Sequence, residues 1–276
     1  MKTLKSCFEK AKRNKFAIGQ FNFSAPEQLE AIVLAAKKTN SPIILGTSQG
    51  EARFFGLEKA IILRNYYRKI FPNIYLNLDH GRDIKFIKKA IDLGYDCVHF
   101  DGGHLSLEQN IKQAKEIVKY AHKRRVLVEG EIKAIEGGSV IHKGMFHLSS
   151  LGYEDTNQAH RFVQSTNIDS FAINVGNVHG VFKNPIKLNI KLLEELSQDL
   201  NCFLVLHGGS GTNTNDLKRA IKNGIVKINI NTELRIVWKQ ALEKELKKKT
   251  IKPYEIYPKV IETTQKKVEE KIKLFK

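Results

Sequence analysis

Short apolar runs alternate with amphipathic stretches along the whole chain. The clearest amphipathic stretches, which predict helices that bury one face, are residues 27–38, 107–123, 188–197 and 216–223. Each apolar run is short enough for a buried strand and is followed by a polar or glycine-containing turn. The eight runs are residues 16–23, 42–46, 74–78, 97–101, 126–131, 170–175, 203–206 and 225–230. This alternation is typical of βαβ units built around a parallel sheet.

Eight strand-helix units favour a sheet that closes on itself. The chain has 276 residues, close to the ~250 residues of a typical eight-stranded barrel, and no linker divides it. A further helical pattern at residues 257–276 follows the eighth unit, and we expect it to pack outside the barrel or against a partner subunit. The sequence therefore predicts one domain, residues 1–276, with the fold of a parallel β/α (TIM) barrel plus an extra C-terminal helix.

The longest interruption of the pattern follows the fifth predicted strand, at residues 133–155. Glycines, His142 and His147 replace the periodic apolar residues there. A loop of this length in a compact domain is usually functional, so we expect it to act as a lid.

The chain is strongly basic, with a formal net charge of +17 at pH 7. Its lysines are spread over the predicted helix faces and are densest at residues 247–249 and 266–276. No nucleic-acid-binding motif or aromatic stacking surface accompanies them, so we interpret the charge as a solvated, lysine-rich surface. Such a surface favours anionic ligands, including sugar phosphates.

Three cysteines are present, an odd number without a CxxC pair, as expected for reduced thiols in the cytoplasm. No stretch approaches the ~20 apolar residues that span a bilayer, and none resembles a secretion signal. We therefore expect a cytoplasmic protein with no membrane partner.

Polar side chains with chemical potential gather at the ends of the predicted strands, where β/α barrels place their active sites. They are Asp79, His80, Asp101, Glu129, Glu131, His179, His207, Asn229, Asn231 and Thr232. Three histidines from three strand ends, His80, His179 and His207, can hold one catalytic zinc ion with an open position. We interpret the other six as ordinary surface or hydrogen-bonded core residues: His99, His104, His122, His142, His147 and His160.

The run HGGSG after the seventh predicted strand is a glycine-rich turn that leads into a helix. Its backbone N–H groups can bind a phosphate at the helix N-terminus, although glycine turns also simply connect strands to helices. The loops after strands seven and eight often bind phosphate in this fold. Lys183, four residues after His179, can add positive charge to such a site.

With these residues in place, the chain resembles class II fructose-bisphosphate and tagatose-bisphosphate aldolases over almost its full length. The stretches that carry the resemblance are FNFSAPEQLEAIVLAAKKTNSPIIL, YLNLDHG, FDGGHLSLEQNI, VEGEI, INVGNVHGVFK, LVLHGGSG and KINI followed by NTELR. The resemblance implies that His80, His179 and His207 hold zinc and that Asp79 transfers protons. It implies a set of residues around the phosphates and the dihydroxyacetone end: Ser48, Lys183, Gly208, Gly209, Ser210, Asn229, Asn231 and Thr232.

The resemblance extends to further properties of the family. Arg235 would contact a second phosphate, while Asp101 and Glu131 would support the zinc ligands or hold a second metal ion. Family members are usually homodimers or larger homo-oligomers, and many use a monovalent cation. The sequence differs from the family pattern at four positions: Asn77, Gly103, Lys133 and Asn231.

The leading functional hypothesis is cleavage of fructose-1,6-bisphosphate to dihydroxyacetone phosphate and glyceraldehyde-3-phosphate, a reaction of glycolysis and gluconeogenesis. Tagatose-1,6-bisphosphate is the alternative, because Arg235 favours fructose whereas the loss of an aspartate at Asn231 does not. A barrel that binds sugar phosphates without catalysis is a third reading, but a pure binding protein has no need for both the three histidines and Asp79.

Overall fold

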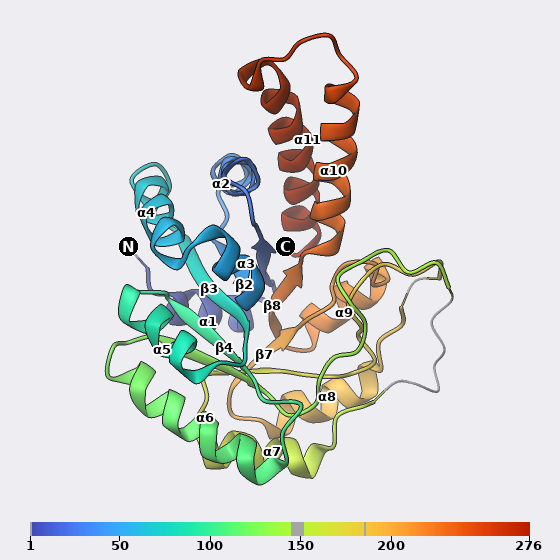
Figure 1. Ribbon diagram of the computed structural model, residues 1–276. Coiled ribbons are helices and arrows are strands. Elements are labelled where there is room, and N and C mark those ends of the chain that lie inside the picture. Colours follow the sequence, from blue (N-terminus) through green and yellow to red (C-terminus); the bar gives the residue numbers. More distant parts are fainter. Residues whose placement is uncertain (1, 145–151, 185) are drawn as a thin grey trace.

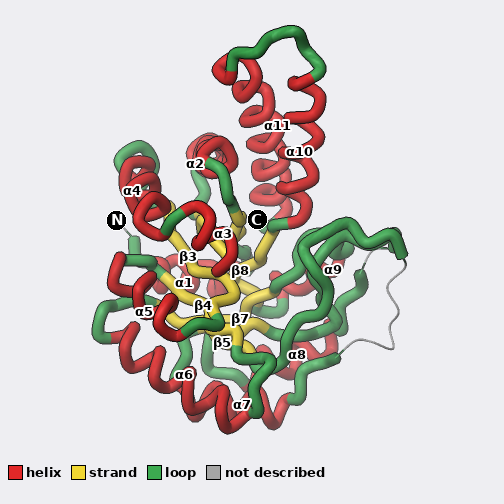
Figure 2. Tube along the Cα trace, viewed as in Figure 1, coloured by secondary structure: helices red, strands yellow, loops and turns green. Residues whose placement is uncertain are grey.

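The computed structural model describes residues 2–144, 152–184 and 186–276. Eight parallel strands close into a barrel in the order β1 to β8, so the predicted fold is confirmed. Figure 2 shows the strands at the centre of the molecule with the helices around them. The strands are β1 (Ile18–Asn22), β2 (Ile43–Ser48), β3 (Ile74–Gly81), β4 (Cys97–Asp101), β5 (Leu127–Glu131), β6 (Ser170–Ala172), β7 (Phe203–Leu206) and β8 (Ile225–Ile230).

All eight predicted strands are present: β4, β7 and β8 have their predicted bounds, β1, β2 and β5 differ by one or two residues at an end, and β3 and β6 differ by three. Strand β3 continues three residues beyond Leu78, to Gly81, and carries Asp79 and His80 into the mouth of the barrel. Strand β6 ends at Ala172 because the asparagines that follow it form local turns. There the Asn174 and Asn177 side chains accept hydrogen bonds from the backbone N–H groups of Gly176 and Val175.

The helices lie between the strands and cover the outside of the barrel (Figure 1). The four predicted helices correspond to α2, α6, α8 and α9, each within two residues of its predicted ends. The helices are α1 (Leu4–Asn14), α2 (Pro26–Thr39), α3 (Gln49–Phe55), α4 (Leu57–Arg68), α5 (Ile84–Leu93), α6 (Leu107–His122), α7 (Thr156–Thr166), α8 (Ile190–Asp199), α9 (Thr214–Lys222), α10 (Thr232–Leu246) and α11 (Pro253–Leu274).

The hydrophobic core fills the space between the strands and the helices, and most strand residues are buried on both faces. This double burial explains why the strands are almost continuous apolar runs in the sequence. Helix α1 closes the N-terminal end of the barrel, where Leu4 and Phe8 pack with Ile18, Tyr75 and Val226. Most polar strand residues lie toward the opposite, C-terminal end, although Ser170 and Lys227 are buried in the first halves of β6 and β8.

Helices α10 and α11 form an antiparallel arm that packs against α2 at its base and extends beyond the barrel (Figure 1). Helix α11 begins at Pro253, four residues before the predicted start, with proline in the first turn, where its missing N–H is tolerated. Lys271 on α11 binds Glu233 on α10 at 2.7 Å. Within the described residues, no helix has the length and apolar character needed to cross a membrane.

Candidate active site

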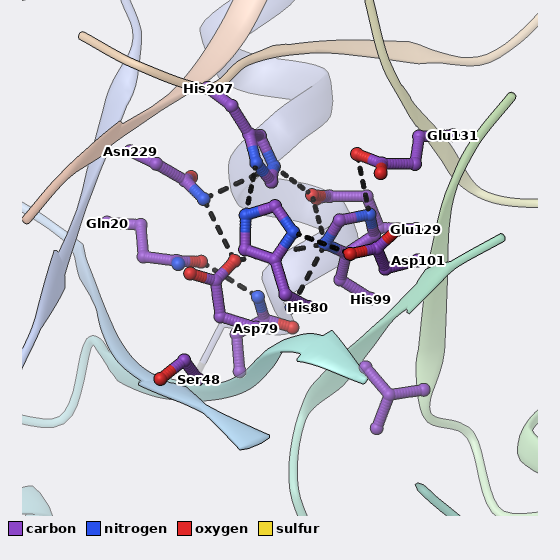
Figure 3. Close-up of polar contacts among 12 residues, drawn as sticks. Gln20, Ser48, Asp79, His80, His99, Asp101, Glu129, Glu131, His207 and Asn229 are labelled. Atoms are coloured by element: carbon purple, nitrogen blue, oxygen red, sulfur yellow. Dashed lines mark hydrogen bonds and ion pairs between the residues drawn. The ribbon is translucent and has the colours of Figure 1, made fainter. Parts of the chain in front are cut away.

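The polar residues of the strand ends meet at the C-terminal mouth of the barrel. Asp79 and His80 come from β3, His99 and Asp101 from β4, and His207 directly follows β7. Figure 3 shows the His80 ring between Asp79, His99 and His207. The ring centroids of His80 lie 4.8 Å from those of His99 and His207, and 5.0 Å from that of His179.

His207 is fully buried and is oriented by a charged pair beneath it. Its Nε2 atom lies 2.8 Å from Glu129 Oε1, and Glu129 Oε2 in turn binds Lys227 Nζ at 2.6 Å. A carboxylate can only accept, so Nε2 of His207 carries the proton and donates. The Nδ1 atom of His207 is then a free acceptor, and it faces His80 Nε2 at 3.1 Å.

The other two predicted ligands show the same arrangement. His80 Nδ1 lies 3.3 Å from Asp101 Oδ2, which also accepts from Arg82 Nε at 2.9 Å. His179 Nδ1 lies 3.2 Å from the carbonyl oxygen of Ile135. In all three histidines one nitrogen is therefore held by an oxygen acceptor while the other remains available, which is the usual pattern of metal-binding histidines.

The protonation states of His179 and His207 agree with ligation, whereas burial alone would lower the pKa of His80 but Asp79 and Asp101 raise it. Burial, reinforced by the charge of His80, lowers the pKa of His179 to about 3. Burial also lowers the pKa of His207 to about 4, although the hydrogen bond that His207 donates to Glu129 opposes this shift. Both are neutral at physiological pH, as metal ligands must be. Burial alone would lower the pKa of His99, but the Asp79 and Glu131 carboxylates outweigh burial and raise this pKa to about 10.

A metal ion fits this donor set. The facing nitrogens of His80 and His207, 3.1 Å apart, cannot both direct lone pairs at one another without a proton or cation between them. Asp101 Oδ1 and Glu131 Oε2 are buried without hydrogen-bond partners. Carboxylates outnumber lysine and arginine side chains around the imidazoles, so a divalent ion would balance the charge there. The ligand atoms of His80 and His207 belong to one group within 4.8 Å of one another, whereas His179 stands outside that group.

Asp79 is held ionised beside these rings. Asn229 and Asn22 donate to its two carboxylate oxygens at 3.0 and 2.9 Å. Burial alone would raise the pKa of Asp79, but His80, His99 and His207 hold it well below its usual range. One lone pair on each oxygen remains free to accept a proton.

A pocket of about 100 Å³ opens above Asp79. It is lined by Asp79, His80 and His179 and by seven of the nine predicted substrate residues: Ser48, Gly208, Ser210, Asn229, Asn231, Thr232 and Arg235. Gly208 has φ of +65°, and a Cβ there would lie 2.1 Å from the Val178 carbonyl oxygen, so glycine is required. A second cavity of about 390 Å³ adjoins the first, shares Ser48, His80 and His179 with it, and contains Arg82.

Arg235 reaches the pocket from α10. It binds Glu51 Oε1 at 2.5 Å and the carbonyl oxygen of Ser139 at 3.4 Å. Glu51 also accepts from the backbone N–H of Ser48, within the capping box that starts α3. Arg235 and Ser48 therefore lie on the same side of the pocket and share one carboxylate.

Two predicted phosphate contacts are not brought into the pocket. Lys183 is exposed and does not line either cavity. The Gly209 N–H donates to the Asn229 carbonyl at 3.1 Å and is used within the fold.

The first part of the predicted lid, residues 133–144, packs beside His179, whose N–H donates to Glu136 O at 2.8 Å. Residues 145–151 of that loop, including His147, lie outside the described residues.

His99 occupies a place in the site that we did not expect from the sequence. We interpreted it as an ordinary surface or hydrogen-bonded core residue, but it is fully buried and belongs to a group with Asp79, His80 and His207 whose ligand atoms lie within 4.8 Å of one another. A signal was available: His99 stands two residues before Asp101 on one strand, and side chains two apart point to the same face. The same spacing joins Lys227 to Asn229 on β8.

These features define a β/α-barrel enzyme with a candidate metal site at the C-terminal mouth. The family described as fructose-bisphosphate aldolase class II matches residues 2–276. The chain belongs to this family and is a class II aldolase.

Two relatives and one solved structure illustrate the similarity. The chain is 36% identical over 272 residues to the 6-phospho-5-dehydro-2-deoxy-D-gluconate aldolase of Shouchella clausii, covering 96% of this chain and 91% of that protein. It is 34% identical over 281 residues to the fructose-bisphosphate aldolase of Staphylococcus aureus, covering 99% and 96%. The crystal structure of the YdjI aldolase of Escherichia coli K12 superposes with a TM-score of 0.85 at 27% identity, covering 99% and 96%.

Proposed function

We propose that the protein catalyses zinc-dependent aldol cleavage of a ketose phosphate, and the reverse condensation, with fructose-1,6-bisphosphate as substrate. The products are dihydroxyacetone phosphate and glyceraldehyde-3-phosphate, which places the reaction in glycolysis and gluconeogenesis. The observation that carries the proposal is the arrangement of His80, His179 and His207, each with one nitrogen held and the other available, directly beside the ionised Asp79.

His80, His179 and His207 would hold the zinc ion, which when bound would supply a Lewis acid for the ketose carbonyl. Asp79 accepts the proton of the C4 hydroxyl on a carboxylate oxygen as the C3–C4 bond breaks. The electron pair of that bond remains with the dihydroxyacetone phosphate half, and C4 leaves as the aldehyde carbon. Asn229 and Asn22 fix the Asp79 carboxylate during this transfer through their hydrogen bonds.

The pocket suits a substrate with an anionic group at each end. Gly208 and Ser210 lie in the turn after β7, and Thr232 begins α10, whose N-terminal N–H groups favour a phosphate. Ser48 and Arg235 line the same pocket and supply a hydroxyl and a guanidinium for a second anion. We assign the dihydroxyacetone phosphate end to the first group and the aldehyde end to the second.

A second candidate substrate is 6-phospho-5-dehydro-2-deoxy-D-gluconate, favoured by the name of the 36% identical relative. Its C4–C6 portion is the same dihydroxyacetone phosphate unit, so the metal site and Asp79 would act identically. The difference lies at the other end, which carries a carboxylate in place of a phosphate. Tagatose-1,6-bisphosphate remains a third candidate, because it differs from fructose-1,6-bisphosphate only in the configuration at C4.

The substrate assignment is tested by supplying the three compounds separately to the zinc-loaded protein and coupling released dihydroxyacetone phosphate to NADH oxidation. We expect the highest kcat/KM for fructose-1,6-bisphosphate. A higher kcat/KM for either alternative would transfer the assignment to that compound, and no dihydroxyacetone phosphate from any of them would refute the proposed function.

We further propose that the protein is a cytoplasmic homo-oligomer. The arm of α10 and α11 carries exposed apolar side chains at its end, where Leu246, Ile251 and Tyr254 are 60%, 91% and 71% exposed. Contact with a second copy would remove them from water. Light scattering after gel filtration would give the mass of a dimer or larger assembly, and a single-chain mass would refute this part of the proposal.

A further inference from the structure

His99 lies inside the site, yet none of the steps above uses it. It is on β4, its side chain is fully buried, and its Nδ1 atom lies 3.9 Å from Asp79 Oδ1. Its Nδ1 atom accepts a hydrogen bond from the backbone N–H of His80 at 3.2 Å. Its Nε2 atom lies 3.4 Å from Glu131 Oε2.

The backbone of His80 needs such a partner. The parallel register of β3 and β4 shifts between Leu78 and Gly81, so the regular ladder is interrupted at His80. His80 also has φ of +47°, the left-handed region that a residue with a side chain rarely adopts. A buried N–H at such an interruption must find an acceptor, and the His99 ring supplies it.

We propose that His99 is a positioning residue that holds the metal ligand His80 through this backbone hydrogen bond. The inference rests on the proposed metal-dependent function. The left-handed backbone at His80 directs its ring toward His179 and His207 while Asp79 faces the pocket from the preceding position. The Nδ1 atom of His99 accepts from His80 on one side of the ring, and the Nε2 atom lies near Glu131 Oε2 on the other.

Three replacements separate this role from simple filling of space. In His99→Asn, the amide oxygen takes the place of Nδ1 and can still accept from His80 N–H. In His99→Leu the acceptor is lost while much of the apolar volume is kept. In His99→Gln the polar atoms reach the position of Nε2 instead, so the bond to His80 is lost although a polar side chain remains.

The experiment measures zinc affinity by competition with a chromophoric chelator and the absorption spectrum of the cobalt-substituted protein. We expect His99→Leu and His99→Gln to bind zinc about 10- to 100-fold more weakly, as is typical when a group that supports a metal ligand is removed. Their cobalt spectra should differ from the parent spectrum because the ring of His80 is displaced. His99→Asn should keep an affinity within about 3-fold of the parent and the parent spectrum.

His160→Asn is the matched control, because this histidine is exposed on α7, away from the site, and its ring forms a hydrogen bond with Gln164 on the same helix. Circular dichroism of the metal-free variants checks that the barrel is folded. If His99→Leu does not fold, His99→Gln carries the same expectation.

Two results would overturn the inference: parent-like zinc affinity and cobalt spectrum in a folded variant that lacks the acceptor, or equal loss in His99→Asn and His99→Gln. A parent protein that binds no zinc would instead overturn the proposed function, on which the inference rests.

Discussion

The buried pair of Lys227 and Glu129 yields the most quantitative prediction. Both side chains are fully buried, and Lys227 Nζ lies 2.6 Å from Glu129 Oε2. The other Glu129 oxygen holds His207 in the orientation that leaves Nδ1 free. Lys227→Met keeps a similar side-chain volume but leaves the carboxylate without its cation, so both stability and the metal site should respond.

The magnitude follows from the burial of the pair. Removing one partner of a buried ion pair typically costs about 3 to 5 kcal/mol, because the remaining charge is uncompensated. Burial alone would raise the pKa of Glu129, but the charge of Lys227 is the strongest of the effects that lower it. Removing the lysine therefore raises the pKa of Glu129. A protonated Glu129 would donate to His207 Nε2, which moves the ring proton to Nδ1 and removes a metal ligand.

The assay is urea unfolding of the metal-free protein, together with zinc affinity of the same preparations. Lys227→Met should lower the free energy of unfolding by about 3 to 5 kcal/mol and weaken zinc binding. The double variant Glu129→Gln with Lys227→Met removes both charges and should recover part of the stability. Lys239→Met is the control, since this lysine is 73% exposed on α10 and should change stability by no more than about 0.5 kcal/mol. If Lys227→Met loses less than about 1 kcal/mol and binds zinc normally, the reasoning is refuted.

Three further predictions concern Asp79, Arg235 and Glu154. Asp79→Asn should retain zinc but lose cleavage by about 10²- to 10⁴-fold, as expected for a general base; near-parent turnover would exclude that role. Arg235→Met should raise KM for fructose-1,6-bisphosphate by about 10- to 100-fold, the value of a charged hydrogen bond, and leave KM for fructose 1-phosphate unchanged; equal effects on both would contradict its contact with the second phosphate. Burial, with a smaller contribution from Glu131, raises the pKa of Glu154 to about 8. Because this folded-state pKa lies above the unfolded value, its stabilising contribution is complete below about pH 4.5 and is lost as pH rises to about 8. Glu154→Gln should therefore be more stable than the parent at pH 8, by up to roughly 4 kcal/mol, and parallel urea-unfolding profiles from pH 5 to 8 would disprove this.

The sequence predicted the barrel well because its strands are buried on both faces and therefore stand out as apolar runs. It also predicted that His80, His179 and His207 lie near one another, since the ends of parallel strands in a closed barrel must converge; their role as metal ligands stays a prediction. It could not predict which nitrogen each histidine uses, because that depends on distant partners such as Glu129, 78 residues from His207. The pairing of Arg235 with Glu51, 184 residues apart, was hidden for the same reason.

The local backbone determines two further features that the sequence did not show. The Gly209 N–H donates to Asn229 O, a contact that depends on how the turn closes onto β8, and phosphate binding by Gly209 stays a prediction. His99 was overlooked because a single histidine in a strand carries no sign of its neighbours. The shift of register between β3 and β4, which gives His99 its hydrogen bond, has no signature in the sequence.

The most direct test of the account measures dihydroxyacetone phosphate release from fructose-1,6-bisphosphate by protein stripped of metal and then titrated with zinc. We predict that the stripped protein is inactive and that activity returns in proportion to added zinc, reaching its full value at about one ion per chain, as three histidines with one open position require. Full activity in the stripped protein, with no response to zinc, would contradict the central claim.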